Sequence, residues 1–182
     1  MYKAKLFFVL LLITGTICFC TLNATDPKAK TGIQKLGRDS IPKPVGYVND
    51  FENLLTPIQE KVLDSIIRAY EKQTSIEIAV LTFDTTLIGR EGLEKFALNV
   101  LNTWGIGKKE KNNGILMAIS SGYRLIRIEN GYGIEKIMTD EETKQIIETN
   151  ILPSFKERKY YEGMLNGVNT LISTLNRKMK LR

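Results

Sequence analysis

The side chains in this sequence that could do chemistry are carboxylates, amides, hydroxyls, lysines and arginines. The 182 residues include no histidine, and the two cysteines, Cys18 and Cys20, both lie near the N-terminus. These features exclude Ser-His-Asp triads, cysteine nucleophiles and the usual nitrogen or sulfur zinc sites. What remains favours hard oxygen ligands for a metal ion, together with basic groups that balance negative charge.

Four polar segments are candidates for a common site. They are residues 49–50, Asp84, residues 111–114 and residues 131–140. Each lies next to a predicted element, and ligands of open α/β sheets bind beyond the carboxyl ends of the strands. We therefore expect these segments to converge at one rim of the sheet.

The Gly-Tyr-Gly sequence at residues 131–133 is the most distinctive of these signals. Its glycines permit positive φ angles that other residues resist, so the chain can turn sharply after a strand and direct Glu135 into a small space. This predicts a concave, oxygen-rich loop. A plain turn is the alternative here and at residues 112–114, and Asp140 or Thr139 can equally serve as a helix cap.

The elements that would position these segments follow from hydrophobic periodicity. A helix is predicted from Pro57, after the capping residue Thr56, to about Lys72, and a helix over residues 93–104 is expected to end at Gly105. The other predicted elements are strands at residues 76–83, 115–119 and 124–129 and helices at residues 140–151, ended by Pro153, and 161–175. This order predicts an α/β fold, a three-layer α/β/α sandwich with a central mixed β-sheet, Rossmann-like in architecture.

The N-terminus has the layout of an export signal. Two lysines precede a continuous apolar run at residues 6–13, and no acidic residue appears before Asp26. We predict a signal peptide or N-terminal membrane anchor at residues 1–24, with lipidation at Cys18 or Cys20 as a third option, and a flexible linker at residues 25–44. The chain is expected outside the cytoplasm, periplasmic or secreted.

The folded domain is predicted at residues 45–176, followed by a basic tail at residues 177–182. The tail accounts for much of the net charge of +6 at pH 7. Loose attraction to an anionic membrane surface fits this charge, whereas the export signal argues against a nucleic-acid partner. We expect a monomer that works beside a membrane or envelope protein.

Three stretches together, WGIGKKEKNNGILMAIS, RLIRIENGYGIEKIMTD and ILPSFKERKYYEGMLNGVNTLI, resemble the TPM domain family, extracytoplasmic modules known from bacteria and from the thylakoid lumen. The resemblance covers about residues 45–175. Residues 104–107, 131–135, Asp140 and residues 153–156 follow the family's order and spacing, and as a set they are specific to it.

The resemblance implies an α/β/α sandwich with a divalent-cation site, often for calcium, at loops beyond the strand ends; magnesium is the alternative. The residues that match the implied metal ligands are Asp50, Asn112, Asn113, Glu135 and Asp140. Many family members carry an aspartate where this chain has one of the two asparagines. An amide oxygen brings no charge, and calcium affinity follows the ligand charge, so weak binding is expected.

Two functions are the main hypotheses from these features, and a purely structural or peptide-binding role is the remaining alternative. The first is an accessory or interaction module that binds a divalent cation near the membrane. The alternative is a metal-assisted acid phosphatase that hydrolyses phosphomonoesters, with Asp140, Arg127 and Lys111 as its catalytic candidates. The phosphatase hypothesis lacks an obvious general acid, because there is no histidine and a carboxyl group would need a raised pKa to serve.

Overall fold

The computed structural model describes residues 41–89 and 92–180. The predicted leader at residues 1–24 and the predicted linker up to residue 40 therefore lie outside the described residues. Among the helices of the described ranges, none has the length and apolar character needed to cross a membrane.

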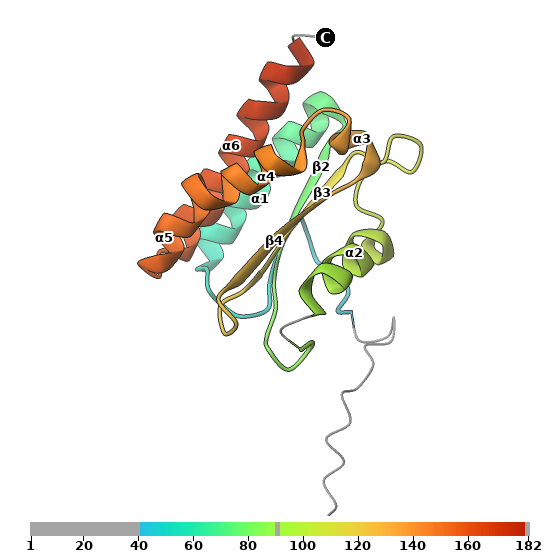
Figure 1. The fold of residues 1–182 in the computed structure, drawn as a ribbon. Coiled ribbons are helices and arrows are strands. Elements are labelled where there is room, and N and C mark those ends of the chain that lie inside the picture. The colour runs from blue at the N-terminus through green and yellow to red at the C-terminus, as the bar shows by residue number, and fades with distance from the viewer. Residues whose placement is uncertain (1–40, 90–91, 181–182) are drawn as a thin grey trace, which may run out of the picture. The chain divides into compact units, whose positions relative to one another are not determined.

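The centre of the fold is a four-stranded mixed sheet in the order β1-β2-β3-β4 (Figure 1). β1 (Val48–Asp50), β2 (Glu77–Thr82) and β3 (Gly114–Ser120) run parallel, and β4 (Leu125–Asn130) is antiparallel to β3. β2 and β3 are central and almost wholly buried, which explains why their sequences are continuous apolar runs. β1 was not predicted, because a strand of three residues is too short to show a pattern.

Helices cover both faces of this sheet. α1 (Pro57–Thr74) and α6 (Tyr160–Lys180) bury apolar stripes against one face, and α2 (Leu93–Trp104) lies on the other. Successive residues of a strand point to opposite faces, so β3 contributes to two cores. Its residues in the first core are Ile115, Met117 and Ile119, and those in the second are Leu116 and Ala118. The predicted α/β/α architecture is confirmed.

The signals that predicted helix ends are confirmed in detail. Thr56 caps α1 in a capping box, in which the Gln59 N–H donates to Thr56 Oγ1 at 3.3 Å and the Thr56 N–H donates to Gln59 Oε1 at 2.8 Å. Gly105 ends α2 in the left-handed conformation, with φ of 66°. Of the two candidate caps for α4 (Asp140–Ile146), it is Thr139 that caps the helix.

The prediction that Pro153 ends the helix after residue 140 is wrong. The chain continues from α4 as a π-helix, η3 (Ile147–Ile151), and then as α5 (Leu152–Lys156). The Leu152 N–H donates to the Ile147 carbonyl five residues back, and this wider turn places Pro153 in the first turn of α5. A proline is tolerated there because the N–H that it lacks would have no partner within α5.

Residues 41–44, which the sequence assigns to the linker, contact the domain. Ile41 packs against the core beneath α2, and the Trp104 indole N–H donates a 2.8 Å hydrogen bond to the Pro42 carbonyl. Trp104 is partly buried against the same core, and it attaches the chain entering the domain to the end of α2.

Candidate functional site

The topology places the predicted site residues at opposite ends of the sheet. Asp50 ends β1 and pairs with Thr82 at the end of β2, so it lies at the carboxyl end of the parallel strands. β4 runs the other way, and its last residue, Asn130, pairs with Ile115 near the start of β3. α3 (Tyr132–Glu135), which follows β4, therefore lies at the opposite end of the sheet (Figure 1). The expectation that the polar segments converge at one rim is wrong. Residues 111–114 lead into β3, and the β3-β4 hairpin brings residues 131–140 back to that same end.

The Gly-Tyr-Gly turn at the amino end of β3 requires glycine for a reason other than the one predicted. Gly131 has φ of −71°, and Gly133 is not among the described glycines with positive φ. A Cβ atom on Gly131 would lie 2.3 Å from the Asn112 carbonyl oxygen, and one on Gly133 would lie 2.1 Å from the Lys111 carbonyl oxygen. These glycines therefore allow the turn to pack directly against the loop before β3.

Asn113 is a buried structural residue of that loop. Its Oδ1 accepts a 2.8 Å hydrogen bond from the Lys108 N–H, and its Nδ2 donates a 2.7 Å hydrogen bond to the Ser75 carbonyl. Asn112 adopts φ of 47°, in the left-handed region that asparagine tolerates, and its carbonyl accepts the Gly133 N–H at 2.9 Å. Both asparagines therefore have local roles in holding the loop.

Glu135 and Asp140, the two acidic candidates that follow β4, are exposed. Across residues 41–89 and 92–180, no group of three or more histidine, cysteine, aspartate or glutamate side chains is arranged to hold a metal ion. The five predicted ligands are thus divided between the two ends of the sheet. Asp50 lies at the carboxyl end of β1, whereas Asn112 and Asn113 precede β3 and Glu135 and Asp140 follow β4.

Two of the three catalytic candidates, Arg127 and Lys111, have side-chain partners, and Asp140 is exposed. Arg127 Nε lies 2.8 Å from Glu129 Oε2. Burial disfavours the charge on Arg127, but acidic neighbours, Glu129 first and Asp140 more weakly, hold the pKa of this guanidinium above its ordinary value. Lys111 Nζ donates a 2.9 Å hydrogen bond to Ser75 Oγ. Arg127 is therefore largely neutralised by carboxylates, and Lys111 belongs to the glycine-rich loop at the other end of β3 from Asp50.

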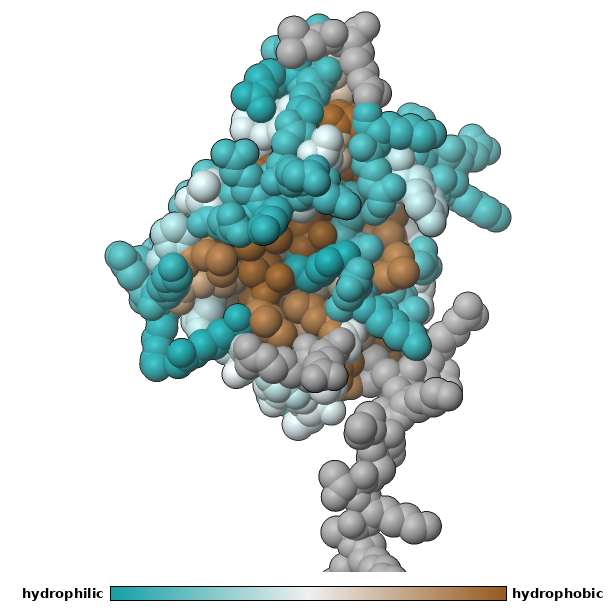
Figure 2. Space-filling model, in the orientation of Figure 1, coloured by the Kyte–Doolittle hydropathy of each residue, from teal (hydrophilic) through white to brown (hydrophobic). Residues whose placement is uncertain are grey.

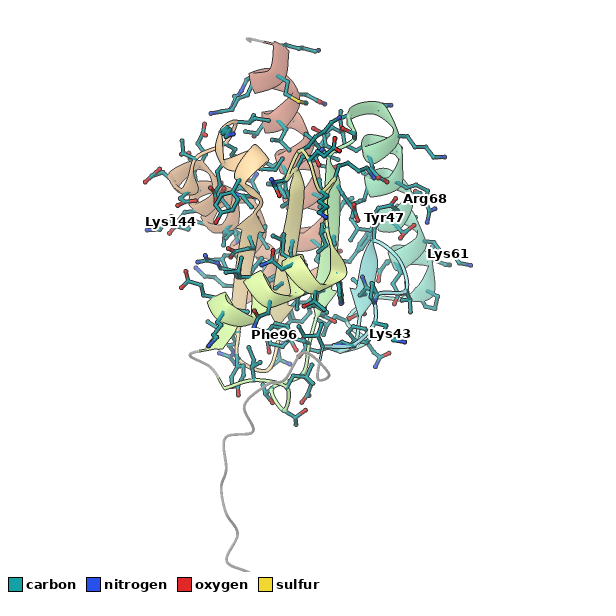
Figure 3. All side chains as sticks on the ribbon, turned by 90° about the vertical axis from the view of Figure 1, so that its right-hand side faces the viewer. Lys43, Tyr47, Lys61, Arg68, Phe96 and Lys144 are labelled. Carbon is teal, nitrogen blue, oxygen red and sulfur yellow. The ribbon has the colours of Figure 1, made fainter. Side chains whose placement is uncertain are left out.

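A second polar network joins α1 to the amino end of β3. The Tyr47 hydroxyl donates to the Glu71 carboxylate, Lys108 Nζ lies 2.5 Å from Glu71 Oε1, and the Arg68 guanidinium lies 5.2 Å above the Tyr47 ring (Figure 3). The hydrogen bond to Glu71, together with burial, raises the pKa of Tyr47 to about 12. Hydrogen bonds from Lys108 and Tyr47 lower the pKa of Glu71. This network attaches the loop after α2 to α1.

At the carboxyl end, the loop after β1 is organised by its own acidic residue. Asp50 Oδ2 accepts a 2.7 Å hydrogen bond from the Leu55 N–H, and its Oδ1 accepts from the Thr82 hydroxyl. Thr82 Oγ1 in turn accepts the Glu52 N–H at 3.0 Å. Asp50 and Glu52 therefore meet at one buried threonine hydroxyl at the end of β2.

Glu52 connects this loop to the β3-β4 turn. Its carboxylate accepts hydrogen bonds from the Ser121 N–H at 2.9 Å, the Ser121 hydroxyl at 3.0 Å and the Gly122 N–H at 3.5 Å. We call this arrangement the Glu52 clasp. Sequence reasoning missed Glu52; the available signal was a second acidic residue two positions after Asp50, at the end of a short strand.

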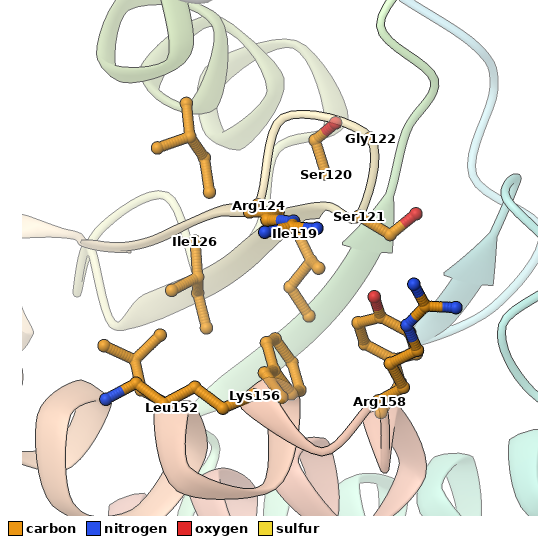
Figure 4. Close-up of a pocket in the computed structure, with 12 residues that line it drawn as sticks. Ile119, Ser120, Ser121, Gly122, Arg124, Ile126, Leu152, Lys156 and Arg158 are labelled. Atoms are coloured by element: carbon orange, nitrogen blue, oxygen red, sulfur yellow. The ribbon is translucent and has the colours of Figure 1, made fainter.

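A pocket of about 780 Å³ lies beside the clasp, between the β3-β4 turn and the turn joining α5 to α6 (Figure 4). We call it the turn pocket. Its lining includes Ser120, Ser121, Arg124, Ile126, Phe155 and Arg158. This pocket could not be predicted from the sequence, because its walls come from two turns separated by more than one helix in the chain.

Comparison with known proteins finds similarity in sequence and in fold. A family profile described as the TPM domain matches residues 48–174. A search of curated proteins finds no match.

Solved structures also include similar folds. The N-terminal domain of a protein from P. gingivalis is 30% identical, with coverage of 80% of this chain and 91% of that chain and a TM-score of 0.68. The BA42 protein from the psychrophilic Bizionia argentinensis is 24% identical, with coverage of 70% of this chain and 86% of that chain and a TM-score of 0.61. At that identity, the second likeness supports the fold alone.

Proposed function

Because the chain belongs to the TPM domain family, we propose that it is an accessory binding module whose working surface is the carboxyl end of its sheet. The Glu52 clasp carries this proposal. Its carboxylate holds Ser121 through the backbone N–H at 2.9 Å and the hydroxyl at 3.0 Å, and Ser121 also lines the turn pocket. A movement of Glu52 in the loop after β1 would therefore move Ser121 in the wall of the turn pocket.

The divalent cation expected from the family resemblance does not fit all five predicted residues, because they are divided between the two ends of the sheet. In our proposal, calcium or magnesium instead binds at the carboxylates of Asp50 and Glu52. The Asp50 carboxylate accepts the Thr82 hydroxyl, and the Glu52 backbone N–H donates to the same hydroxyl oxygen. Asp50 Oδ1, Asp50 Oδ2 and Glu52 Oε2 each accept one hydrogen bond, so each keeps a second lone pair for a cation. The cation would supply positive charge that orders the acidic loop.

A calcium titration followed by amide NMR tests this proposal. We expect chemical-shift changes at residues 50–55 and 121–124, and we expect Glu52→Gln to abolish them. Glu135→Gln is the matched control, since it removes an exposed acidic residue at the other end of the sheet, and it should leave the response unchanged. Shifts confined to residues 112–113 and 135–140 would contradict the proposed location, and the absence of any shift at millimolar calcium would contradict the cation.

The proposed module acts outside the cytoplasm, next to a membrane or envelope protein. The support for this part is the pattern of lysines and apolar residues at residues 1–24, which lie outside the described residues. Cell fractionation with an epitope at the C-terminus tests it. Recovery from the envelope or the medium is expected, and recovery only from the cytoplasm would contradict it.

The same purified protein separates a binding module from the phosphatase alternative. We expect no hydrolysis of p-nitrophenyl phosphate from acidic to neutral pH with calcium or magnesium added. Metal-dependent turnover that disappears in Asp140→Ala would instead establish the enzyme and assign a role to the amino end of β3.

A further inference from the structure

The turn pocket has a strongly one-sided charge. Its twelve lining residues include three cationic side chains, Arg124, Lys156 and Arg158, and no acidic one. Within the described ranges, none of the three takes part in an ion pair or a side-chain hydrogen bond. Glu157, which lies between two of them in the chain, is paired with Lys159 at 2.6 Å. The pocket therefore presents three unneutralised cations to whatever enters it.

The backbone at the two arginines is an independent observation. Arg124 has φ of 54° and Arg158 has φ of 60°, both in the left-handed region that glycine or asparagine adopts at lower energetic cost. Each closes a turn, since the Arg124 N–H donates to the Ser121 carbonyl at 3.1 Å and the Arg158 N–H donates to the Phe155 carbonyl at 3.0 Å. Backbone strain of this kind concentrates at functional sites. Here both strained arginines line the same pocket (Figure 4).

Most of the remaining lining is apolar, and Ser120, Ser121 and Tyr160 add hydroxyl groups. Ile126 of β4 and Leu152 and Phe155 of α5 are half-buried and line the pocket. Figure 2 shows apolar surface gathered in the middle of the face seen in Figure 1, bordered by hydrophilic side chains. A ligand that fits must therefore combine negative charge with an apolar group, and a volume of about 780 Å³ is far larger than a single phosphate or carboxylate requires.

The pocket also adjoins a free sheet edge. β4 pairs only with β3 among the described strands, and the 2.8 Å hydrogen bond from the Gly131 N–H to the Gly114 carbonyl fixes which residues face outward. Hydrogen-bonded and non-hydrogen-bonded pairs alternate in an antiparallel ladder, so the N–H and C=O of Ile126 point away from β3. Neither has a hydrogen-bond partner in the described residues. An extended chain can pair with such an edge.

We infer that the turn pocket binds an extended acidic peptide segment of a partner protein. A carboxylate of the peptide lies between Arg124 and Arg158, an apolar side chain packs on Phe155, and the peptide backbone pairs with Ile126. Guanidinium groups suit this role because their fork of donors matches a carboxylate. The inference rests on the proposed function and names the class of partner.

The left-handed arginines allow a test without loss of the fold. Arg124→Gly and Arg158→Gly remove both guanidinium groups and relieve the positive φ, so the double variant is expected to be as stable as the parent. Ser75→Gly is the matched control, since it changes a residue with φ of 64° at the other end of the sheet. Random decapeptides displayed on phage are selected on the full chain, and the enriched peptides are titrated into each variant.

We expect selection of peptides rich in acidic and apolar residues, with amide shifts at Ile126 and in both turns. Affinity should fall at least tenfold in the double variant and be unchanged in Ser75→Gly. Failure to enrich acidic peptides, or equal binding to the double variant, would overturn the inference. Equal shifts with inorganic phosphate alone would also overturn it, in favour of a small-anion site. If the protein binds the peptides but shows no amide shifts with calcium, only the proposed cation site is contradicted, and the peptide site stands.

Discussion

At the amino end of β3 the chain brings glycines into backbone contact, whereas at the carboxyl end it joins two loops through side chains. Cβ atoms added to Gly114, Gly131 and Gly133 would lie 2.1 to 2.3 Å from carbonyl oxygens of other residues. At the carboxyl end, by contrast, Glu52 reaches the β3-β4 turn with its carboxylate. The first junction packs backbone directly against backbone, and the second lies beside an open pocket.

This difference explains why the two ends of β3 leave different patterns in the sequence. A close approach of two backbones needs glycine at fixed positions, so it leaves a pattern that is easily seen in the sequence. A pocket built from side chains of two turns accepts many residue types and leaves none. The Gly-Tyr-Gly stretch is therefore explained by the close backbone contact at the amino end of β3.

Replacing Gly133 by alanine gives the sharpest test of the amino-end junction. A methyl group there would meet the Lys111 carbonyl oxygen at 2.1 Å and the Asn112 carbonyl oxygen at 3.0 Å, and both are backbone atoms that cannot move aside alone. We expect a loss of about 3 kcal/mol in the free energy of unfolding, measured by urea denaturation. Gly89→Ala is the control, since nothing lies within 4 Å of its added Cβ. Equal stability of the two variants would show that the junction accommodates a methyl group.

Asn113 distinguishes a structural role from a ligand role at the same end. Its amide donates to the Ser75 carbonyl at 2.7 Å and accepts from the Lys108 N–H at 2.8 Å, and an aspartate can supply only the second interaction. We expect both Asn113→Ala and Asn113→Asp to lose about 2 kcal/mol of stability, because each leaves a buried polar group without its partner. Calcium that restored Asn113→Asp to parental stability in thermal denaturation would instead show that this position is a metal ligand.

The elements could be predicted from the sequence where a periodic pattern is long. Strands β2 and β3 show continuous apolar runs, and α1 carries a complete capping box at Thr56 and Gln59. β1 and α3, with three and four residues, are too short for such patterns. The π-helix before Pro153 was missed because its wide turn depends on packing against α6 and leaves no composition signal.

The site was less predictable, since it depends on strand direction. Asp50 was identified as a site residue, but its distance from Glu135 is set by the antiparallel return of β4, which reverses the end at which α3 emerges. The turn pocket depends on the backbone conformation of Arg124 and Arg158, and an arginine with positive φ looks like any other arginine in a sequence.

At the carboxyl end, Thr82→Val tests whether the acidic loop depends on its shared hydroxyl. Valine keeps the shape of threonine in a fully buried position, but it removes the donor to Asp50 and the acceptor of the Glu52 N–H. We expect a loss of about 1.5 kcal/mol in the free energy of unfolding and faster amide hydrogen exchange at residues 52–55. Thr170 of α6 is half-buried, and its hydroxyl makes only an exposed hydrogen bond to the Asn166 carbonyl. Thr170→Val should therefore change neither quantity, and a similar effect in both variants would mean that the Thr82 hydroxyl network has no special role.

The smallest expected effect concerns the Glu71 network and its dependence on pH. Hydrogen bonds from Lys108 and Tyr47 lower the pKa of Glu71 below 4.5 in the folded chain, so the unfolded chain binds this proton more readily. The resulting stability is present above pH 4.5 and is lost as the pH falls through the folded pKa. Because Lys108 is half exposed, Glu71→Gln should cost only about 1 kcal/mol at pH 7, and urea denaturation should show this difference shrinking as the solution is acidified below pH 4.5. Arg68 stays in place over the Tyr47 ring in this variant. A stability difference between the parent and Glu71→Gln that persisted at low pH would therefore contradict the electrostatic role of Glu71 and assign the difference to packing on Tyr47.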